Sequence, residues 1–133
     1  MKKFIISIDA GTTSNRSILF DLKGKPVYSS QKEFTQYFPK NGWVEHDPNE
    51  IWKSTIKTLK DVISKAKKLK GKILTIGITN QRETTVLWDK KTGIPVYKAI
   101  VWQDRRTEDY CEKLRKRNKD TAIFNKTGLL IDP

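Results

Sequence analysis

Cysteine and histidine are almost absent from this sequence, which has one of each among 133 residues, Cys111 and His46. A single cysteine cannot form an internal disulfide, which favours a reducing compartment such as the cytoplasm. A structural zinc site built from several Cys and His ligands is excluded. We expect His46 to be a structural residue ahead of a helix rather than a general base, because no Ser or Cys partner stands at a suggestive position.

Long apolar runs are missing as well. No stretch approaches 18 apolar residues, and the chain passes from Lys2 and Lys3 directly into a predicted strand. The sequence therefore predicts neither a transmembrane helix nor a signal peptide, and no membrane partner. An apolar content of 36%, with four Trp and five Phe, predicts a folded protein, and the length suits one domain.

Acidic residues are scarce, since 15 Asp and Glu face 27 Lys and Arg and give a net charge of +12. Such an excess can accompany nucleic-acid binding. Here 21 of the cations are lysines, spread along the chain without an aromatic-interleaved patch. We therefore expect solvated surfaces and no nucleic-acid partner, with a non-catalytic basic binding module as the alternative.

Strand patterns open the chain. Short apolar runs at residues 4–8 and 17–20 predict two buried strands, and the imperfect alternation at 27–34 predicts an edge strand. Three strands joined by hairpins are therefore expected at the N-terminus. Gly11 is expected to supply the positive φ that a tight connection often needs.

A long amphipathic helix is predicted after residue 47. Asp47 is its expected N-cap, Pro48 suits its first position, and Glu50 would complete a capping box. Its apolar residues recur at spacings of 4, 3, 4 and 3 and predict a packing face made of Trp52, Ile56, Leu59, Ile63 and Ala66.

The apolar run at 73–78 follows this helix and predicts a central strand. The resulting order is βββαβ, an α/β fold with a mixed sheet. Further short elements are predicted as strands at 86–88 and 99–101, and as helices at 107–117 (packing through Tyr110, Cys111 and Leu114) and 120–125.

A polar turn follows the first strand. Thr12, Thr13 and Ser14, together with backbone N–H groups, could cradle phosphate oxygens. Asp9 could hold Mg²⁺ directly or through water, and Arg16 could add a charge-assisted contact to a phosphate. Taken alone, an ordinary polar hairpin remains the alternative. A Walker A loop is excluded, because no second Gly and no Gly-Lys-Ser/Thr follow.

A second polar stretch, residues 79–85, follows the strand at 73–78, at the kind of place where α/β sheets bind ligands. The guanidinium of Arg82 and the carboxylate of Glu83 would suit a small polyol, whose hydroxyls both donate and accept; a surface ion pair is the alternative. Adjacent residues of an ideal strand point to opposite faces, so the backbone must bend if both contact one ligand. Trp102 could line one side of the pocket, or could be a core tryptophan.

Five stretches, in order, resemble the N-terminal part of the FGGY carbohydrate kinase family: residues 8–16, 42–48, 77–85, 99–107 and 127–133. The resemblance implies a ribonuclease-H-like/actin-like ATPase fold and transfer of the γ-phosphoryl group of ATP, with Mg²⁺. The Arg82-Glu83 pair is similar to that of the members that convert glycerol to sn-glycerol 3-phosphate. Another small polyol or sugar is the alternative substrate.

The resemblance also implies roles for single residues. Thr12, Thr13, Ser14 and Arg16 would contact the nucleotide phosphates, and Asp9 would lie near Mg²⁺. Arg82 and Glu83 would bind glycerol hydroxyls, with Trp102 lining that pocket.

The sequence departs from the family's pattern in two mild ways and one severe one. Many relatives have Gln at the position of Ala10 and Ser at that of Asn15. The family's chains are several times longer, so residues 1–133 are expected to form only part of an N-terminal domain. The catalytic aspartate is expected beyond Pro133, and the chain alone is expected to be inactive. The full-length protein is expected to be a cytoplasmic homo-oligomer.

Overall fold

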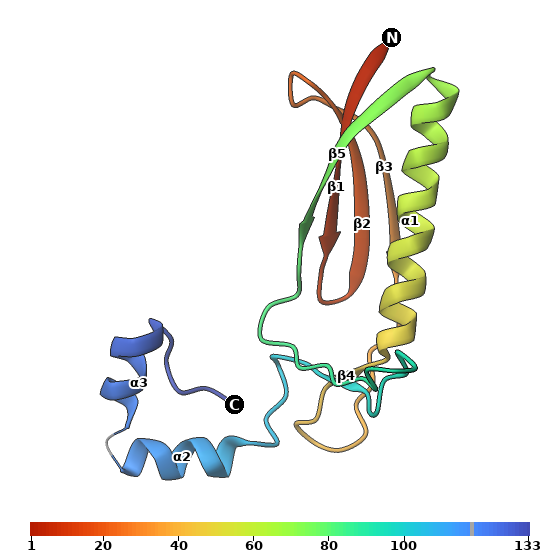
Figure 1. Ribbon diagram of the computed structural model, residues 1–133. Helices are drawn as coiled ribbons and strands as arrows, with labels where there is room; N and C mark the ends of the chain where they lie inside the picture. Colours follow the sequence, from red (N-terminus) through yellow and green to blue (C-terminus); the bar gives the residue numbers. More distant parts are fainter. Residues whose placement is uncertain (118) are drawn as a thin grey trace.

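A computed structural model describes residues 1–117 and 119–133. Over these residues the elements run in the following order (Figure 1): β1 (Lys2–Ala10), β2 (Ser14–Asp21), β3 (Pro26–Glu33), β4 (Glu45–His46), α1 (Pro48–Lys68), β5 (Gly71–Thr79), β6 (Ala99–Ile100), α2 (Glu108–Lys116) and α3 (Asp120–Thr127). The predicted βββαβ order is confirmed, if the two-residue β4 is set aside.

The main sheet has the strand order β3-β2-β1-β5. β1 pairs antiparallel with β2, β2 pairs antiparallel with β3, and β1 pairs parallel with β5, so the sheet is mixed as predicted. The prediction of β3 as an edge strand is confirmed. The prediction of β5 as a central strand is wrong for this sheet, because β5 forms its other edge, and Ile78 is 74% exposed there.

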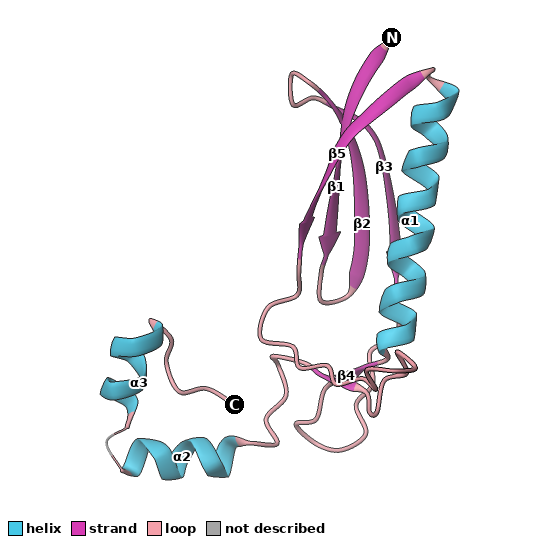
Figure 2. Ribbon diagram, in the orientation of Figure 1, coloured by secondary structure: helices cyan, strands magenta, loops and turns pink. Residues whose placement is uncertain are grey.

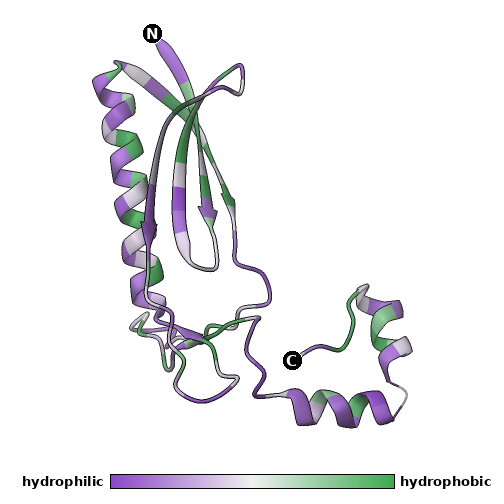
Figure 3. Ribbon diagram, turned by 180° about the vertical axis from the view of Figure 1, so that it is seen from behind, coloured by the Kyte–Doolittle hydropathy of each residue, from purple (hydrophilic) through white to green (hydrophobic). Residues whose placement is uncertain are grey.

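Helix α1 lies along one face of the sheet (Figure 2). The core between them is a cluster of buried apolar residues: Phe4, Ile6, Ile8, Leu19, Val62 and Ala66. Each of the larger side chains (Phe, Ile, Leu and Val) removed from water there contributes about 1.5–3 kcal/mol. Figure 3 shows hydrophilic and hydrophobic residues alternating along α1.

The face of α1 that packs on the sheet matches the predicted one in part, because Ala66 is buried and Leu59 and Ile63 pack against the core. Its buried residues recur every four positions: Ser54, Thr58, Val62 and Ala66. Ser54 Oγ lies 2.6 Å from Asn15 Nδ2, and Thr58 Oγ1 lies 2.9 Å from Ser17 Oγ. Small polar side chains thus bring this end of the helix onto β2, whereas Trp52 is 65% exposed. The apolar spacing could not show this, because Ser and Thr count as polar in it.

The start of α1 is capped in part as predicted. Asp47 accepts a hydrogen bond from the backbone N–H of Asn49, and Pro48 occupies the first turn. The predicted capping box is wrong, because Glu50 accepts from the Tyr37 hydroxyl at 2.7 Å and from the Thr35 N–H at 3.0 Å. These bonds hold the pKa of Glu50 below its ordinary value, and they fasten the loop before β4 to the helix.

The remaining segment has little regular structure, and α2 and α3 lie away from the sheet (Figures 1 and 2). The strand predicted at 86–88 is wrong, since this stretch forms only the isolated bridge between Trp88 and Pro95. Both predicted helices are confirmed; Cys111 is buried, but Tyr110 on the predicted packing side is 64% exposed. No helix in the described residues combines the length and apolar character that a bilayer crossing requires.

Candidate functional site

The polar turn between β1 and β2 is tight. The backbone N–H of Gly11 donates to the carbonyl oxygen of Ser14 at 3.0 Å. Gly11 does not have a positive φ, so that prediction is wrong. The glycine is needed for a different reason, because a Cβ on it would lie 3.0 Å from the Ser14 carbonyl oxygen.

Asp9 and Arg16 face each other across the β1–β2 pair, so their side chains project from the same face of the sheet. Arg16 donates from Nε and Nη2 to Gln31 Oε1, at 3.1 and 2.7 Å. Gln31 in turn donates to Ser14 Oγ at 2.7 Å. Sequence reasoning missed Gln31; the pairing of β2 with β3, which places it opposite Arg16, would have revealed it.

The second polar stretch turns sharply after β5 ends at Thr79. Glu83 has a φ of 50°, in the left-handed region that non-glycine residues rarely adopt. The backbone therefore bends at the place where a bend is needed for both side chains to face one ligand. Arg82 and Glu83 both line one cleft. A strained residue of this kind is held by its surroundings, and such residues cluster at ligand sites.

This cleft, of about 310 Å³, joins the two polar stretches. Its lining includes five predicted site residues: Asp9, Thr12, Arg82, Glu83 and Trp102. Thr13, Ser14 and Arg16 are not in the lining, although they belong to the same hairpin.

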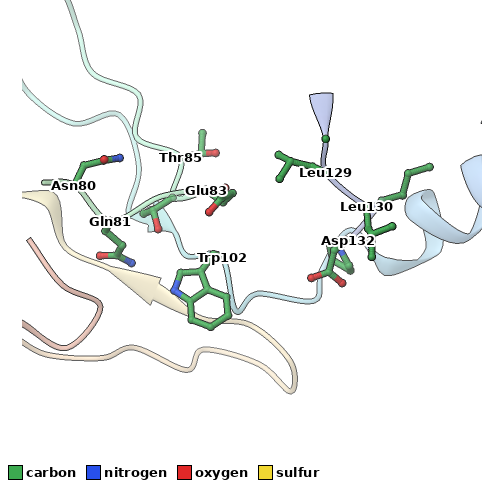
Figure 4. Close-up of a pocket in the computed structure, with 12 residues that line it drawn as sticks. Asn80, Gln81, Glu83, Thr85, Trp102, Leu129, Leu130 and Asp132 are labelled. Carbon is green, nitrogen blue, oxygen red and sulfur yellow. The ribbon is translucent and has the colours of Figure 1, made fainter. Parts of the chain in front are cut away.

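Trp102 connects the two halves of this cleft. Its indole N–H donates to Thr12 Oγ1 at 3.1 Å, and its side chain is 45% exposed, so it is not a core tryptophan. It also lines a neighbouring cleft of about 880 Å³ (Figure 4), where Gln81 and Glu83 lie on one side and Leu129 and Leu130 on the other. Both clefts therefore meet at Trp102.

A buried ion network supports the segment that carries Trp102. Arg106 Nη2 lies 2.8 Å from both Glu45 Oε1 and Asp104 Oδ2, and its guanidinium stacks over the Trp43 ring at 3.7 Å. Burial raises the pKa of Asp104, but the hydrogen bonds from Arg106 and from the Val44 N–H outweigh it and hold that pKa below its ordinary value. The network joins β4 to the chain after β6. No motif in the sequence indicates it.

Among the described residues no three His, Cys, Asp or Glu side chains cluster as a metal site would require. Asp9, at the end of β1, and Glu83, in the loop after β5, are both exposed carboxylates that line the cleft. This arrangement fits Mg²⁺, which keeps several waters and is commonly held by one or two carboxylates together with substrate phosphates.

His46 is fully buried, and burial lowers the pKa of its imidazole. Its ring packs edge-on against Phe34, with the ring centroids 5.1 Å apart. The buried ring fits the predicted structural role of His46.

Comparison with known families and curated proteins gives a consistent result. The sequence model of the N-terminal domain of the FGGY family of carbohydrate kinases matches residues 4–133. The chain is 61% identical over 132 residues to a glycerol kinase of Oceanobacillus iheyensis and 58% identical over 133 residues to one of Bacillus subtilis. These matches cover 99% and 100% of this chain but 26% and 27% of the relatives. The chain therefore spans about a quarter of the length of the curated relatives it matches.

Comparison with solved structures agrees with these sequence matches. The chain matches a Plasmodium falciparum glycerol kinase with ADP at a TM-score of 0.88 and 36% identity, covering 98% of this chain and 26% of that one. It matches a ligand-bound xylulose kinase of Lactobacillus acidophilus at a TM-score of 0.89 and 27% identity, and the match covers 98% of this chain and 26% of that one. The mixed sheet with α1 on one face is thus the start of the expected actin-like ATPase fold.

Proposed function

Since the chain belongs to the FGGY family of carbohydrate kinases, we propose that it supplies the phosphate-binding turn and the polyol-binding loop of a kinase that phosphorylates glycerol with ATP. The observation that carries the proposal is the single cleft lined by Asp9, Thr12, Arg82, Glu83 and Trp102. The product would be sn-glycerol 3-phosphate. The activity is proposed for a protein of the relatives' length, of whose N-terminal domain residues 1–133 form part.

The turn between β1 and β2 would hold the nucleotide phosphates. The Thr12 hydroxyl accepts from Trp102, which leaves its own proton to donate to a phosphate oxygen. Thr13 and Ser14 would add hydroxyls. Arg16 uses two of its five N–H donors on Gln31, so others remain for a phosphate. Asp9 would hold Mg²⁺, which neutralises charge on the phosphates when bound.

The loop after β5 would hold glycerol. Arg82 would donate to a hydroxyl oxygen and Glu83 would accept a hydroxyl proton, while the indole of Trp102 would cover the carbon backbone. Phosphoryl transfer needs its two reactants in line and its developing charge stabilised. Placing both loops on one cleft would serve the first need, and the donors of the turn would serve the second.

The other proposed properties follow from the family. We propose a cytoplasmic protein whose partners are glycerol and ATP, homo-oligomeric at full length, with no nucleic-acid or membrane partner. We also propose that the chain alone does not turn over, because the catalytic aspartate implied by the resemblance is not among its residues.

A chimera tests the proposal: the Bacillus subtilis relative, carrying this chain in place of its own matching segment. We expect it to phosphorylate glycerol with ATP. Arg82→Ala should lower kcat/KM for glycerol about 10- to 150-fold, the loss of one charge-assisted hydrogen bond. Arg117→Ala, at the exposed end of α2, is the matched control and should leave it unchanged.

Three results would contradict the proposal. A chimera that prefers gluconate or xylulose to glycerol would favour the other sugar-kinase specificities. Equal losses of kcat/KM in Arg82→Ala and Arg117→Ala would show that Arg82 does not belong to the site. Salt-sensitive binding of an oligonucleotide by the chain, without any kinase activity in the chimera, would favour the basic binding module.

A further inference from the structure

Two side chains with no role in the proposed site, Gln36 and His46, lie between its two loops. Gln36 Nε2 donates to the carbonyl oxygen of Thr12 at 3.2 Å, and Gln36 Oε1 lies 2.6 Å from His46 Nε2. On the other side of the ring, His46 Nδ1 lies 3.5 Å from Gln81 Nε2. Hydrogen bonds thus connect the phosphate turn to the residue beside Arg82.

The partners of Gln36 set the direction of these bonds. Its amide nitrogen donates to two carbonyl oxygens, those of Thr12 and Phe34, so its Oε1 must be the acceptor toward His46. The imidazole proton is therefore on Nε2. Nδ1 then carries a lone pair and can accept from Gln81. Because the ring is fully buried against Phe34, it has little freedom to adopt another arrangement.

We propose that Gln36 and His46 are positioning residues that couple the phosphate turn to the polyol loop. Their hydrogen bonds fix Gln81, and Gln81 is followed directly by Arg82 and by the strained Glu83. On the cleft side, the hydrogen bond from Trp102 to Thr12 gives a second contact between the turn and the residues that line the cleft. A shift of the turn on binding phosphates is thereby transmitted to the side chains that face glycerol. The ligands named here rest on the proposed function; the connection between the loops does not.

The connection is tested without any ligand, by nuclear magnetic resonance on the chain itself. Long-range ¹H–¹⁵N spectra should place the His46 proton on Nε2. Gln36→Leu should shift the amide resonances of residues 80–83, because it removes the acceptor that orients the ring. Asn125→Leu, which removes an exposed amide side chain in α3, is the matched control and should leave residues 80–83 unmoved.

The role of His46 in the transmission needs a second variant. In a His46→Leu background, adding Gln36→Leu should produce no further shift at residues 80–83. The same shift with and without His46 would overturn the proposal, as would a proton on Nδ1 in the unmodified chain. The proton position is read without a substitution, so it decides even where His46→Leu does not fold.

Steady-state kinetics of the chimera measure the coupling between the phosphate turn and the polyol loop. Saturating ATP should lower the KM for glycerol about 5-fold or more, and Gln36→Leu should bring this ratio toward one while kcat changes less. The same ATP effect in parent and variant would overturn the coupling. A chimera that does not phosphorylate glycerol would overturn the proposed function instead, and the resonance experiments would still decide on the connection.

Discussion

Leu19 and Leu130 are the same side chain in opposite situations: Leu19 is fully buried between α1 and the sheet, and Leu130 is 79% exposed. They represent two regions of the molecule. In residues 2–79, strands and a helix enclose an apolar core. In residues 80–117 and 119–133, regular structure is sparse, and several large apolar side chains are exposed: Leu87, Trp88, Ile94, Val96, Leu129 and Leu130.

Polar contacts fix the second region to the first at two places. The Arg106 network binds the segment after β6 to β4, and the bond from Trp102 to Thr12 reaches the turn between β1 and β2. Apolar burial is non-directional and stabilises whatever is enclosed, whereas buried ion pairs demand a specific geometry. The two regions therefore differ: packing around an apolar core holds the body of the first, whereas hydrogen bonds and ion pairs attach the second to it. The predictions below test this difference.

The largest effect is expected from Arg106→Leu. Glu45 and Asp104 are 2% and 3% exposed, so removing their shared cation leaves two buried carboxylates unpaired. The free energy of unfolding should fall by about 3–5 kcal/mol, measured by urea denaturation. Arg106→Leu combined with Glu45→Gln and Asp104→Asn removes the charges as well and should recover part of the loss. A loss below about 1 kcal/mol in the single variant would mean that the network does not hold this region.

The paired substitutions Leu19→Ala and Leu130→Ala measure the comparison directly. Leu19→Ala leaves a cavity in the core and should lower the free energy of unfolding by about 2–5 kcal/mol. Leu130→Ala should change it by less than about 0.5 kcal/mol, because its side chain is already in water. Thermal or urea denaturation of both variants is the measurement, and similar losses would contradict the division into two regions.

Much of the packed region could be predicted, because its strands and helix repeat a local pattern. The strands at 4–8 and 17–20 and the start of α1 at Asp47 follow from apolar runs and a cap residue. The packing face of α1 could be predicted only in part, since Ser54 and Thr58 reach the sheet through hydrogen bonds to Asn15 and Ser17. Those partners lie 39 and 41 residues away in sequence.

The sequence pointed to several residues that line the cleft, but not to the hydrogen bonds that connect its parts. The bend at Glu83 followed from requiring Arg82 and Glu83 to face one ligand, and the structure has it. The bonds of Gln31 to Arg16 and of Gln36 to His46 depend on strand register and loop path. No local periodicity encodes those, so single residues in the sequence carried no signal of them.

A smaller effect is expected from pH, through His46. Burial holds the pKa of its imidazole below 6.5, whereas the unfolded chain takes up a proton near that value. The unfolded state therefore binds more protons below pH 6.5, and stability should fall as the pH drops through this window. Urea denaturation from about pH 7 to about pH 5 measures the slope, above the range where carboxylates titrate. His46→Gln should flatten it; an unchanged slope in that variant would assign the effect to another group.

The smallest effect is expected at the end of the second region, where Arg105 Nη1 lies 2.6 Å from Asp132 Oδ1. Both side chains are about half exposed or more, so Asp132→Asn should change the free energy of unfolding by at most about 1 kcal/mol. Its effect should be local, because this pair links residue 132 to the segment after Trp102. Amide hydrogen exchange should speed up at residues 129–132 and stay unchanged in β1 and β2. Lys57→Ala, which removes the exposed Lys57–Asp61 pair of α1, is the matched control and should leave residues 129–132 unaffected. Faster exchange throughout the sheet in Asp132→Asn would show that the two regions unfold together as one unit.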